Sequence, residues 1–348
     1  MSRLARALFL PVCLAVIVAA GFSVPLPVFV ETPREPVSLD ERVVVAVEDA
    51  TLRGDYLLLA VTLSRGTVAR LLQAVVDADR TVVAEAQLLP PHEDDDTYFA
   101  RQRDVFEETA AVAAAVGLQA AGYTVDPREV TGSGVLVAEV VPGTPAENRL
   151  APGDVIVAVD GTPVRGFEDL RAVMPDDAGA ALLLDVERDD EHVQVELETA
   201  ALQTADGTRP GVGILGQTHE PRIDLPVDVA VDGGGIGGPS AGLMVALTVY
   251  DKAARDVDLA AGRNVAGTGR IDQDGNVGAV GGVRQKVAAA EATGAEVLVV
   301  PAALLDTAKA ARRPGSTLEI IGVATFDEAR DALLDGGSVT LPVSTRAA

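Results

Sequence analysis

The segment Asp232-Gly233-Gly234-Gly235-Ile236-Gly237-Gly238-Pro239-Ser240-Ala241-Gly242 decides how the second half of this chain is interpreted. The residues before it, Ile223 to Asp232, predict a β-strand, and those after it, Ala241 to Ala254, predict a helix. A strand, a glycine-rich turn and a helix place Ser240 at a helix N-terminus. There, unpaired N–H groups, which we expect around Gly238 to Ala241, and the positive end of the helix dipole can stabilise an oxyanion. This arrangement is typical of a nucleophile.

The same glycines also satisfy the pattern of a dinucleotide-binding turn, with Gly233, Gly235 and Gly238 in the Gly-x-Gly-x-x-Gly positions. Asp256 and Asp258 lie near the distance expected for the ribose-binding acid, but no clear second strand leads to them. A dinucleotide enzyme is therefore a distant alternative. No Gly-x-x-x-x-Gly-Lys-Ser/Thr sequence occurs, so we predict no ATPase motor. We also expect that the reaction requires no nucleotide or other cofactor and no metal.

A serine nucleophile needs a base. The chain has three histidines: His92, His192 and His219. The first two fall in other predicted domains, which leaves His219, 21 residues before Ser240, as an alternative base. Lys286 is the better candidate because it lies on the opening turn of a predicted helix that ends near Ala292, where burial and the helix dipole would lower its pKa. It could then accept the proton of Ser240, although a lone lysine on a helix is often only a surface charge.

Two motifs together resemble the proteolytic domain of the Lon proteases. They are Gly238-Pro239-Ser240-Ala241-Gly242 and Gly281-Gly282-Val283-Arg284-Gln285-Lys286, with Ser240 and Lys286 46 residues apart. Between them, Gly267-Thr268-Gly269-Arg270-Ile271 and Asp274-Gly275-Asn276-Val277 match the strand and hairpin of that family. The likeness spans residues from about 210 to 340.

The resemblance implies a Ser/Lys dyad that hydrolyses peptide bonds, with Ser240 as nucleophile, Lys286 as base and Thr268 as a supporting residue that hydrogen-bonds the lysine. Thr268 could also be an ordinary strand threonine, because threonine favours strands regardless of function. One departure stands out. Many Lon proteins carry an acidic residue two positions before the proline, where this chain has Gly237.

Residues from about 123 to 200 predict a small β-rich domain. Its expected elements are strands at Gly134 to Val141, Asp154 to Asp160, Ala181 to Arg188 and His192 to Glu198, with a one-sided helix at Phe167 to Met174. The runs Val135 to Val141, Pro142-Gly143-Thr144-Pro145-Ala146, Leu150 to Ile156 and Val159-Asp160-Gly161 resemble a PDZ domain.

A PDZ-like domain implies binding of a peptide C-terminus. We expect the loop Ser133, Gly134, Val135 and Leu136 to hold the terminal carboxylate through backbone N–H groups. The peptide would then add as a strand beside Val135 to Val141, with the helix from Phe167 as the wall of the groove. The domain could also be a scaffold that binds nothing.

The N-terminal sequence predicts that the chain is exported from the cytoplasm. Arg3 and Arg6 precede 24 uncharged residues, Ala7 to Val30, which is long enough for a helix to cross a bilayer with the basic end in the cytoplasm. This makes the expected location the cell membrane, single-pass, with the protease domain extracytoplasmic. The alternative is secretion after cleavage of a signal peptide, favoured by Pro25 and Pro27, which would end a helix early.

The amino-acid composition limits the classes of partner that we expect the protein to bind. The formal net charge of -24 repels phosphates, so nucleic-acid binding is disfavoured. Cys13 is the only cysteine, which excludes an intramolecular disulfide. We expect protein or peptide substrates and contact with the membrane through the N-terminal segment, with a homo-oligomer as an option.

The predicted fold is an α+β multidomain chain: a membrane or signal segment at 1–30, a small mixed region with a connecting helix at 31–121, a PDZ-like domain at 122–203 and a Lon-type α/β proteolytic domain at 204–348. Within 31–121 we expect strands at Arg42 to Val47 and Tyr56 to Leu63, then helices at Val68 to Val76 and 97–121. This order resembles the bacterial membrane-anchored PDZ-containing Lon-like proteases, which implies an ATP-independent serine endopeptidase. The alternative is a PDZ-based peptide-binding protein with an inactive protease domain.

Overall fold

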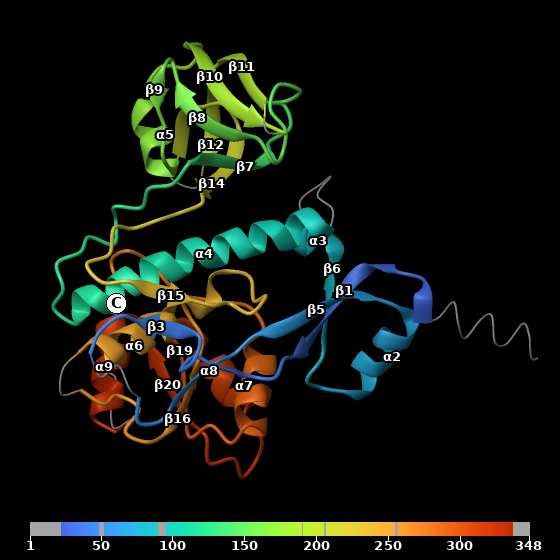
Figure 1. Cartoon of the computed structure of the whole chain (residues 1–348). Helices are drawn as coiled ribbons and strands as arrows, with labels where there is room; N and C mark the ends of the chain where they lie inside the picture. The colour runs from blue at the N-terminus through green and yellow to red at the C-terminus, as the bar shows by residue number, and fades with distance from the viewer. Residues whose placement is uncertain are drawn as a thin grey trace, which may run out of the picture.

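The computed structural model describes residues 22–48, 52–89, 95–189, 191–204, 207–254 and 257–336. These residues form a larger α/β body and a smaller β-rich body, joined by two chain segments that run side by side (Figure 1). The larger body contains residues from both ends of the described chain, and the smaller body is inserted between them.

A five-stranded sheet organises the larger body, in the order β2-β4-β16-β19-β20. The bounds are Val37–Ser38 for β2, Asp55–Leu58 for β4, Asn264–Gly267 for β16, Val297–Pro301 for β19 and Glu319–Val323 for β20. β4, β16, β19 and β20 are parallel, and β2 adds antiparallel at the β4 edge. The inner strand β19 is apolar and buried along its whole length, as expected for a parallel sheet covered on both faces.

Helices cover both faces of this sheet. Alternate residues of β19 point to opposite sides, so Val297 and Val299 join one core while Leu298 and Val300 join the other. The first core includes side chains of α4 (Asp95–Ala120), α6 (Gly242–Ala253) and α9 (Phe326–Leu334). The second includes side chains of α7 (Val283–Ala292) and α8 (Leu305–Ala311), which follows the short 3-10 turn Ala302–Leu304.

Helix α4 packs closely on α6, and a glycine permits the approach. A Cβ atom placed on Gly117 would lie 2.6 Å from the carbonyl oxygen of Ala246 and 3.0 Å from the Cβ of Val249. The predicted helix at 97–121 is confirmed with small shifts of its ends. Gly122, with φ +93°, follows its last residue in a conformation that glycine adopts without strain.

A separate antiparallel sheet, β5-β1-β6, lies at the N-terminal side of the larger body. Its strands are Val61–Gly66, Leu26–Pro33 and Thr81–Ala84, and it carries α2 (Val68–Val76) and the single turn α3 (Glu85–Leu88). The strand predicted from Tyr56 to Leu63 is therefore two strands in two sheets, because the apolar run continues through the crossing at Leu59 and Ala60, which are both buried.

The predicted N-terminal membrane segment falls mostly in residues 1–21, which lie outside the described residues. Its last part, Leu26 to Val30, is not helical but belongs to β1, with Phe29 and Val30 buried in the body. Pro25 and Pro27 account for this correction, since proline disfavours helix interiors. None of the helices in the described part of the chain combines the length and the apolar character required to cross a bilayer.

The β-rich body is built on the sheet β11-β10-β8-β7-β14, with β9 paired to β8. The strands are Glu191–Glu198 (β11), Ala181–Arg188 (β10), Val155–Val159 (β8), Gly134–Val140 (β7), Ile214–His219 (β14) and Thr162–Pro163 (β9). Helix α5 (Phe167–Val173) covers the sheet, and β12 (Ala200–Thr204) forms a hairpin with β13 (Gly207–Gly211). The predicted strands and helix of this region are confirmed in kind and approximate place.

The predicted limits at residues 121 and 203 separate segments that the structure joins. Residues 31–121 share a sheet and a core with the C-terminal part, through β4 and α4. β14 lies beyond residue 203 but completes the β-rich sheet. The body is bounded instead by Thr131 and Arg222, whose backbones exchange two hydrogen bonds, at 2.8 Å and 2.6 Å.

Two further strand pairs complete the larger body. β15 (Val229–Val231) pairs with β3 (Val43–Val45), and β17 (Arg270–Ile271) pairs with β18 (Val277–Gly278). The strand predicted over Ile223 to Asp232 is thus reduced to its last third. Pro226 explains this, because it supplies no N–H to a ladder.

Candidate active site

Ser240 lies where a 3-10 turn, Pro239–Ala241, leads into α6. Gly238, with φ +82°, turns the chain into this position, and its N–H donates to the carbonyl of Gln102 on α4 at 2.7 Å. That N–H is therefore occupied and does not serve an oxyanion. Ser240 itself is in the opening turn, where backbone N–H groups have no partner inside the helix. The predicted placement of Ser240 at a helix N-terminus is confirmed.

Thr268 connects the serine to the lysine. It follows the last residue of β16 and is fully buried. The Nζ of Lys286 donates to its Oγ1 at 2.8 Å, and this hydroxyl in turn donates to the carbonyl oxygen of Ser240 at 3.2 Å. The Gly269 N–H donates to the same carbonyl at 3.0 Å. A continuous hydrogen-bonded chain thus runs from the ammonium group to the backbone of Ser240.

Ser240 and Lys286 line one cavity of about 390 Å³. Its other side chains come mainly from β1, β5 and α4, among them Glu31, Tyr98 and Phe99, and glycines 235, 237, 238 and 281 add backbone atoms. Apolar and polar side chains both contribute to the lining. The structure therefore brings the sequence-predicted serine, threonine and lysine together at a cavity.

The environment of Lys286 favours its neutral form. The side chain is 3% exposed, on the first turn of α7. Burial lowers the pKa of Lys286 to about 8, against an opposing effect of the Glu31 carboxylate, which raises it. Burial also raises the pKa of Glu31, and the nearby Lys286 charge lowers it. Among the described residues, these pKa shifts identify Glu31 and Lys286 as the only pair of opposite charges in the cavity.

The close approach of α4 explains why position 237 is a glycine. A Cβ atom at this position would lie 2.8 Å from the Cβ of Gln102 and 3.1 Å from its carbonyl carbon. Helix α4 therefore excludes the acidic residue that many Lon proteins have here. The carboxylate nearest to the lysine comes instead from Glu31 on β1.

The alternative sites do not form. His219 lies on β14 of the β-rich body, near Asp104 of α4, and does not line the cavity of Ser240. The glycine-rich turn does not follow a parallel strand, because β15 pairs antiparallel with β3. A dinucleotide turn requires a β-α-β unit at this point, so the glycines serve the close packing of α4 instead.

The predicted peptide-binding loop requires a correction. β7, which contains Gly134, Val135 and Leu136, is bonded to β14 on one side and β8 on the other, so no peptide can add to it. The N–H of Ser133 already donates to the carbonyl of His219 at 3.0 Å. The open edge belongs to β14, and the predicted wall helix lies beside it.

Helix α5 lies against β14 at this edge. The N–H of Phe167, the first residue of α5, donates to the hydroxyl of Thr218 on β14 at 3.2 Å. The Phe167 ring also approaches Gly216, where a Cβ atom would lie 3.5 Å from it. The strand edge beside α5 that has no partner among the described residues is therefore that of β14, not that of β7.

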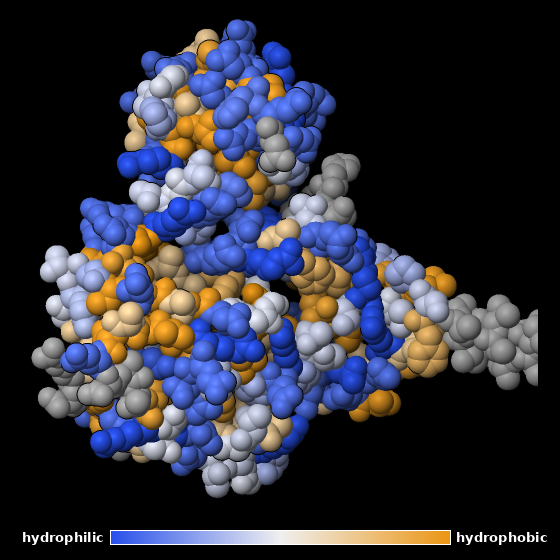
Figure 2. Space-filling model, in the orientation of Figure 1, coloured by the Kyte–Doolittle hydropathy of each residue, from blue (hydrophilic) through white to orange (hydrophobic). Residues whose placement is uncertain are grey.

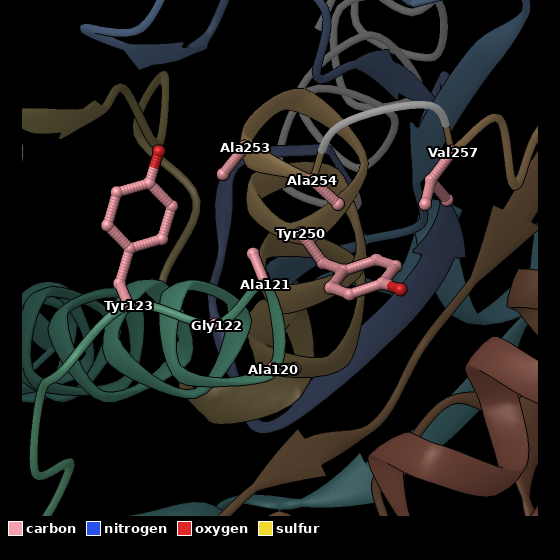
Figure 3. Close-up of a pocket in the computed structure, with 8 residues that line it drawn as sticks. All are labelled: Ala120, Ala121, Gly122, Tyr123, Tyr250, Ala253, Ala254 and Val257. Carbon is pink, nitrogen blue, oxygen red and sulfur yellow. The ribbon is translucent and has the colours of Figure 1, made fainter.

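A second cavity, of about 510 Å³, lies at the C-terminal ends of α4 and α6 (Figure 3). Small side chains, including Ala121, Ala253 and Ala254, separate Tyr123 from Tyr250, and the two hydroxyl groups point in different directions. It contains no acid, base or cation. This larger cavity therefore offers no arrangement for catalysis.

Two family models match the chain, one over each part of the sequence. The family model of the PDZ domain matches residues 115–199, and the model of the Lon protease (S16) C-terminal proteolytic domain matches residues 210–335. The chain thus carries a PDZ-like domain and a segment similar to the Lon proteolytic domain, in a mixed α/β fold.

Relatives named as proteases are similar to parts of the chain. Lon protease 2 of Bacillus subtilis is 29% identical over 35% of this chain and 20% of its own length. The magnetosome formation protease MamE of Paramagnetospirillum magneticum is 36% identical over 29% of this chain and 15% of its own. The pro-apoptotic serine protease NMA111 of Phaeosphaeria nodorum is 32% identical over 28% and 9%. The chain therefore covers one fifth or less of these relatives.

Solved structures similar to the chain include PDZ domains of SdrC-like proteins. The domain from Listeria innocua is 24% identical, with 25% of this chain and 96% of that chain covered and a TM-score of 0.22. The one from Listeria monocytogenes is 26% identical, with 25% and 90% covered and a TM-score of 0.23.

Two contributors to the cavity were missed from sequence. Glu31 is the first charged residue after the uncharged run that ends at Val30. Its position directly after this run is the signal that could have drawn attention to it. Gln102 acts through its backbone carbonyl, so its side-chain type carried no signal.

Proposed function

We propose that this chain is a serine endopeptidase that works without ATP, with Ser240 as nucleophile and Lys286 as general base. The observation that carries the proposal is the hydrogen-bonded chain from Lys286 through Thr268 to Ser240 at the edge of an open cavity. The match of residues 210–335 to the Lon proteolytic domain supports the same assignment.

The proposed reaction begins with neutral Lys286. The Oγ of Ser240 attacks the carbonyl carbon of the scissile peptide bond while its proton passes to the lysine Nζ, and the carbonyl oxygen becomes an oxyanion. The backbone N–H of Ser240 is available to that oxyanion in the first turn of the helix. The intermediate collapses, the C–N bond breaks, and the lysine returns the proton to the leaving amine. Water then hydrolyses the acyl-enzyme with the same base.

Thr268 is proposed as the residue that positions the base. Its hydroxyl accepts from Lys286 and donates to the Ser240 carbonyl, so it fixes the ammonium group relative to the nucleophile's backbone. A buried lysine without such a partner would have an unsatisfied polar group, which is costly.

The PDZ-like body is proposed to recruit substrates by their C-termini. Among the described residues, β14 has the open strand edge that an added peptide strand requires, and α5 lies beside it. β14 also contacts the larger body, since the side chain of Gln217 donates to the Asp104 carboxylate of α4 at 3.4 Å. The same helix holds the Gly238 N–H next to the nucleophile, so a bound peptide could affect the site as well as deliver to it.

We propose that the protein acts outside the cytoplasm at the membrane, held by the uncharged N-terminal segment. The supports are the basic residues Arg3 and Arg6 and the apolar composition that follows them. Secretion after cleavage of this segment is the alternative, and the mass of the mature protein recovered from membranes distinguishes the two.

The test is hydrolysis of casein and of a fluorogenic peptide library without ATP. The parent chain is compared with Ser240→Ala and Lys286→Ala, and with Lys309→Ala as a matched control, because Lys309 is exposed on α8 and away from the cavity. We expect cleavage by the parent and the control only. Cleavage that survives Ser240→Ala would refute the proposed nucleophile.

A further inference from the structure

Helix α2 has an apolar face that no part of the described chain covers. None of its nine residues is buried. Val68, Leu72, Val75 and Val76 follow the i, i+4, i+7, i+8 spacing of one helix face, and they are exposed by 50%, 65%, 84% and 84%. A helix in a soluble body normally turns such a face toward the core, whereas here it points away from the body.

Exposed apolar residues concentrate in this region. Ten large hydrophobic side chains are exposed among the described residues. Seven of them lie in or next to α2 and the sheet β5-β1-β6: Phe22, Val24, Val68, Leu72, Val75, Val76 and Val82. Figure 2 shows hydrophobic residues on this side of the molecule, over the region of β1 and α2. Contiguous apolar surface of this kind marks a contact with a protein or a membrane.

The position of the face favours a membrane. The described chain starts at Phe22, and the fifteen residues before it, 7–21, carry no charge. β1 begins at Leu26, and α2 packs beside β1. The apolar face of α2 and the start of the described chain therefore lie on the same side of the body (Figure 1).

The charges around α2 also favour a lipid surface. The chain as a whole has a net charge of -24, which an anionic bilayer repels. α2 contains a single charged residue, Arg70, and no carboxylate. The first two acids after it are each paired with an arginine: Asp77 with Arg80 at 2.8 Å, and Asp79 with Arg313 at 2.7 Å.

We propose that the apolar face of α2 lies in the interfacial layer of the bilayer, beside the N-terminal segment. This inference rests on the proposed membrane attachment, and it adds a second contact that fixes how the body is oriented. An amphipathic helix of this kind inserts its apolar side among the headgroups and acyl chains. Because Glu31 is five residues beyond Leu26 on β1, the cavity would lie roughly 17 Å along the strand from its start, at about 3.4 Å per residue. Substrates would then be cleaved close to the bilayer surface.

The experiment uses the full chain in bilayers of phosphatidylethanolamine and phosphatidylglycerol. Cys13→Ser removes the only native cysteine, and Val76→Cys introduces one site for an environment-sensitive fluorophore. Leu334→Cys is the matched control, because it is also an exposed apolar residue at the end of a helix, at 51%, but lies on α9. Lipids with a nitroxide near the headgroup then quench fluorophores at the interface.

We expect the label at position 76 to lose most of its emission to the nitroxide lipids, and the label at 334 to lose little. If the protein is recovered with the bilayers but neither label is quenched, the anchor stands and the α2 contact is refuted. A label at 76 that is shielded only at high protein concentration, without quenching, would show that a second copy covers the face and would equally overturn the proposal. Recovery of the protein in the soluble fraction would refute both the anchor and the lipid contact.

Discussion

The dependence of the rate on pH is the most specific consequence of the cavity, and Glu31→Gln is the substitution that tests its cause. Burial lowers the pKa of Lys286 to about 8. At pH 7 the neutral fraction of such a lysine is about 9%, compared with about 0.03% for an ordinary lysine with a pKa near 10.5. The buried site thus supplies roughly 300 times more of the reactive form.

The rate kcat/KM should therefore rise about tenfold per pH unit up to pH 7 and level off above pH 8, where Lys286 becomes mostly neutral. Glu31 opposes this effect, because its negative charge stabilises the ammonium form and raises the pKa of the lysine. Glu31→Gln removes the charge and keeps the size of the side chain. The pKa of Lys286 should fall further, and the rising limb of the profile should move to lower pH.

The assay is kcat/KM for a fluorogenic peptide between pH 5.5 and about 9.5, a range that brackets the Lys286 pKa of about 8. Glu35→Gln is the matched control, because it removes the same charge from an exposed position four residues further on. Its profile should coincide with that of the parent. A limb that stays in place in Glu31→Gln, or moves to higher pH, would refute the assigned coupling between Glu31 and the base.

Three more outcomes follow from the contacts. Thr268→Val should lower kcat by about 10- to 100-fold with KM little changed, because Lys286 loses its hydrogen-bond partner. Thr268→Ser should recover most of the rate, and a valine variant as active as the parent would contradict the positioning role. Replacing residues 132–221 with a short glycine-serine linker, which the paired backbones at both ends permit, should preserve cleavage of short peptides and impair cleavage of protein substrates; equal loss on both would argue against recruitment. Tyr56→Phe should lower the free energy of unfolding by about 2 kcal/mol in denaturant titrations, because the buried Asp251 carboxylate loses a hydrogen bond of 2.8 Å, and an unchanged midpoint would show that this bond is not stabilising.

The chemistry-bearing part of the fold was predictable because its signals are local. A glycine-rich turn before a helix places Ser240, and the spacing to Lys286 matches a known pattern. The helices at α2 and α4 were also found, since their apolar periodicity and their ends are encoded within the segments themselves. Thr67 caps α2 through its side chain, and Gly122 follows the end of α4.

The parts that depend on distant pairing were not predictable. The run from Tyr56 to Leu63 is apolar throughout, and only the positions of β16 and β1 decide that it is divided between two sheets. The peptide-binding edge was assigned to β7 because the sequence does not show that β14, some 80 residues later, pairs with it. The predicted domain limit at residue 121 separates α4 from α6, although the two helices pack together. The sequence does not reveal this packing, because the contact at Gly117 involves a segment more than 120 residues away.

Covalent labelling of the serine tests the central claim most directly. The full chain is treated with a fluorophosphonate at several pH values, and the modified residue is identified by peptide mass spectrometry. The account predicts a single adduct on Ser240, formed faster as pH rises toward about 8 and lost in Lys286→Ala. Peptide cleavage without any adduct on Ser240, or labelling of Ser240 at an undiminished rate in Lys286→Ala, would contradict the Ser/Lys assignment.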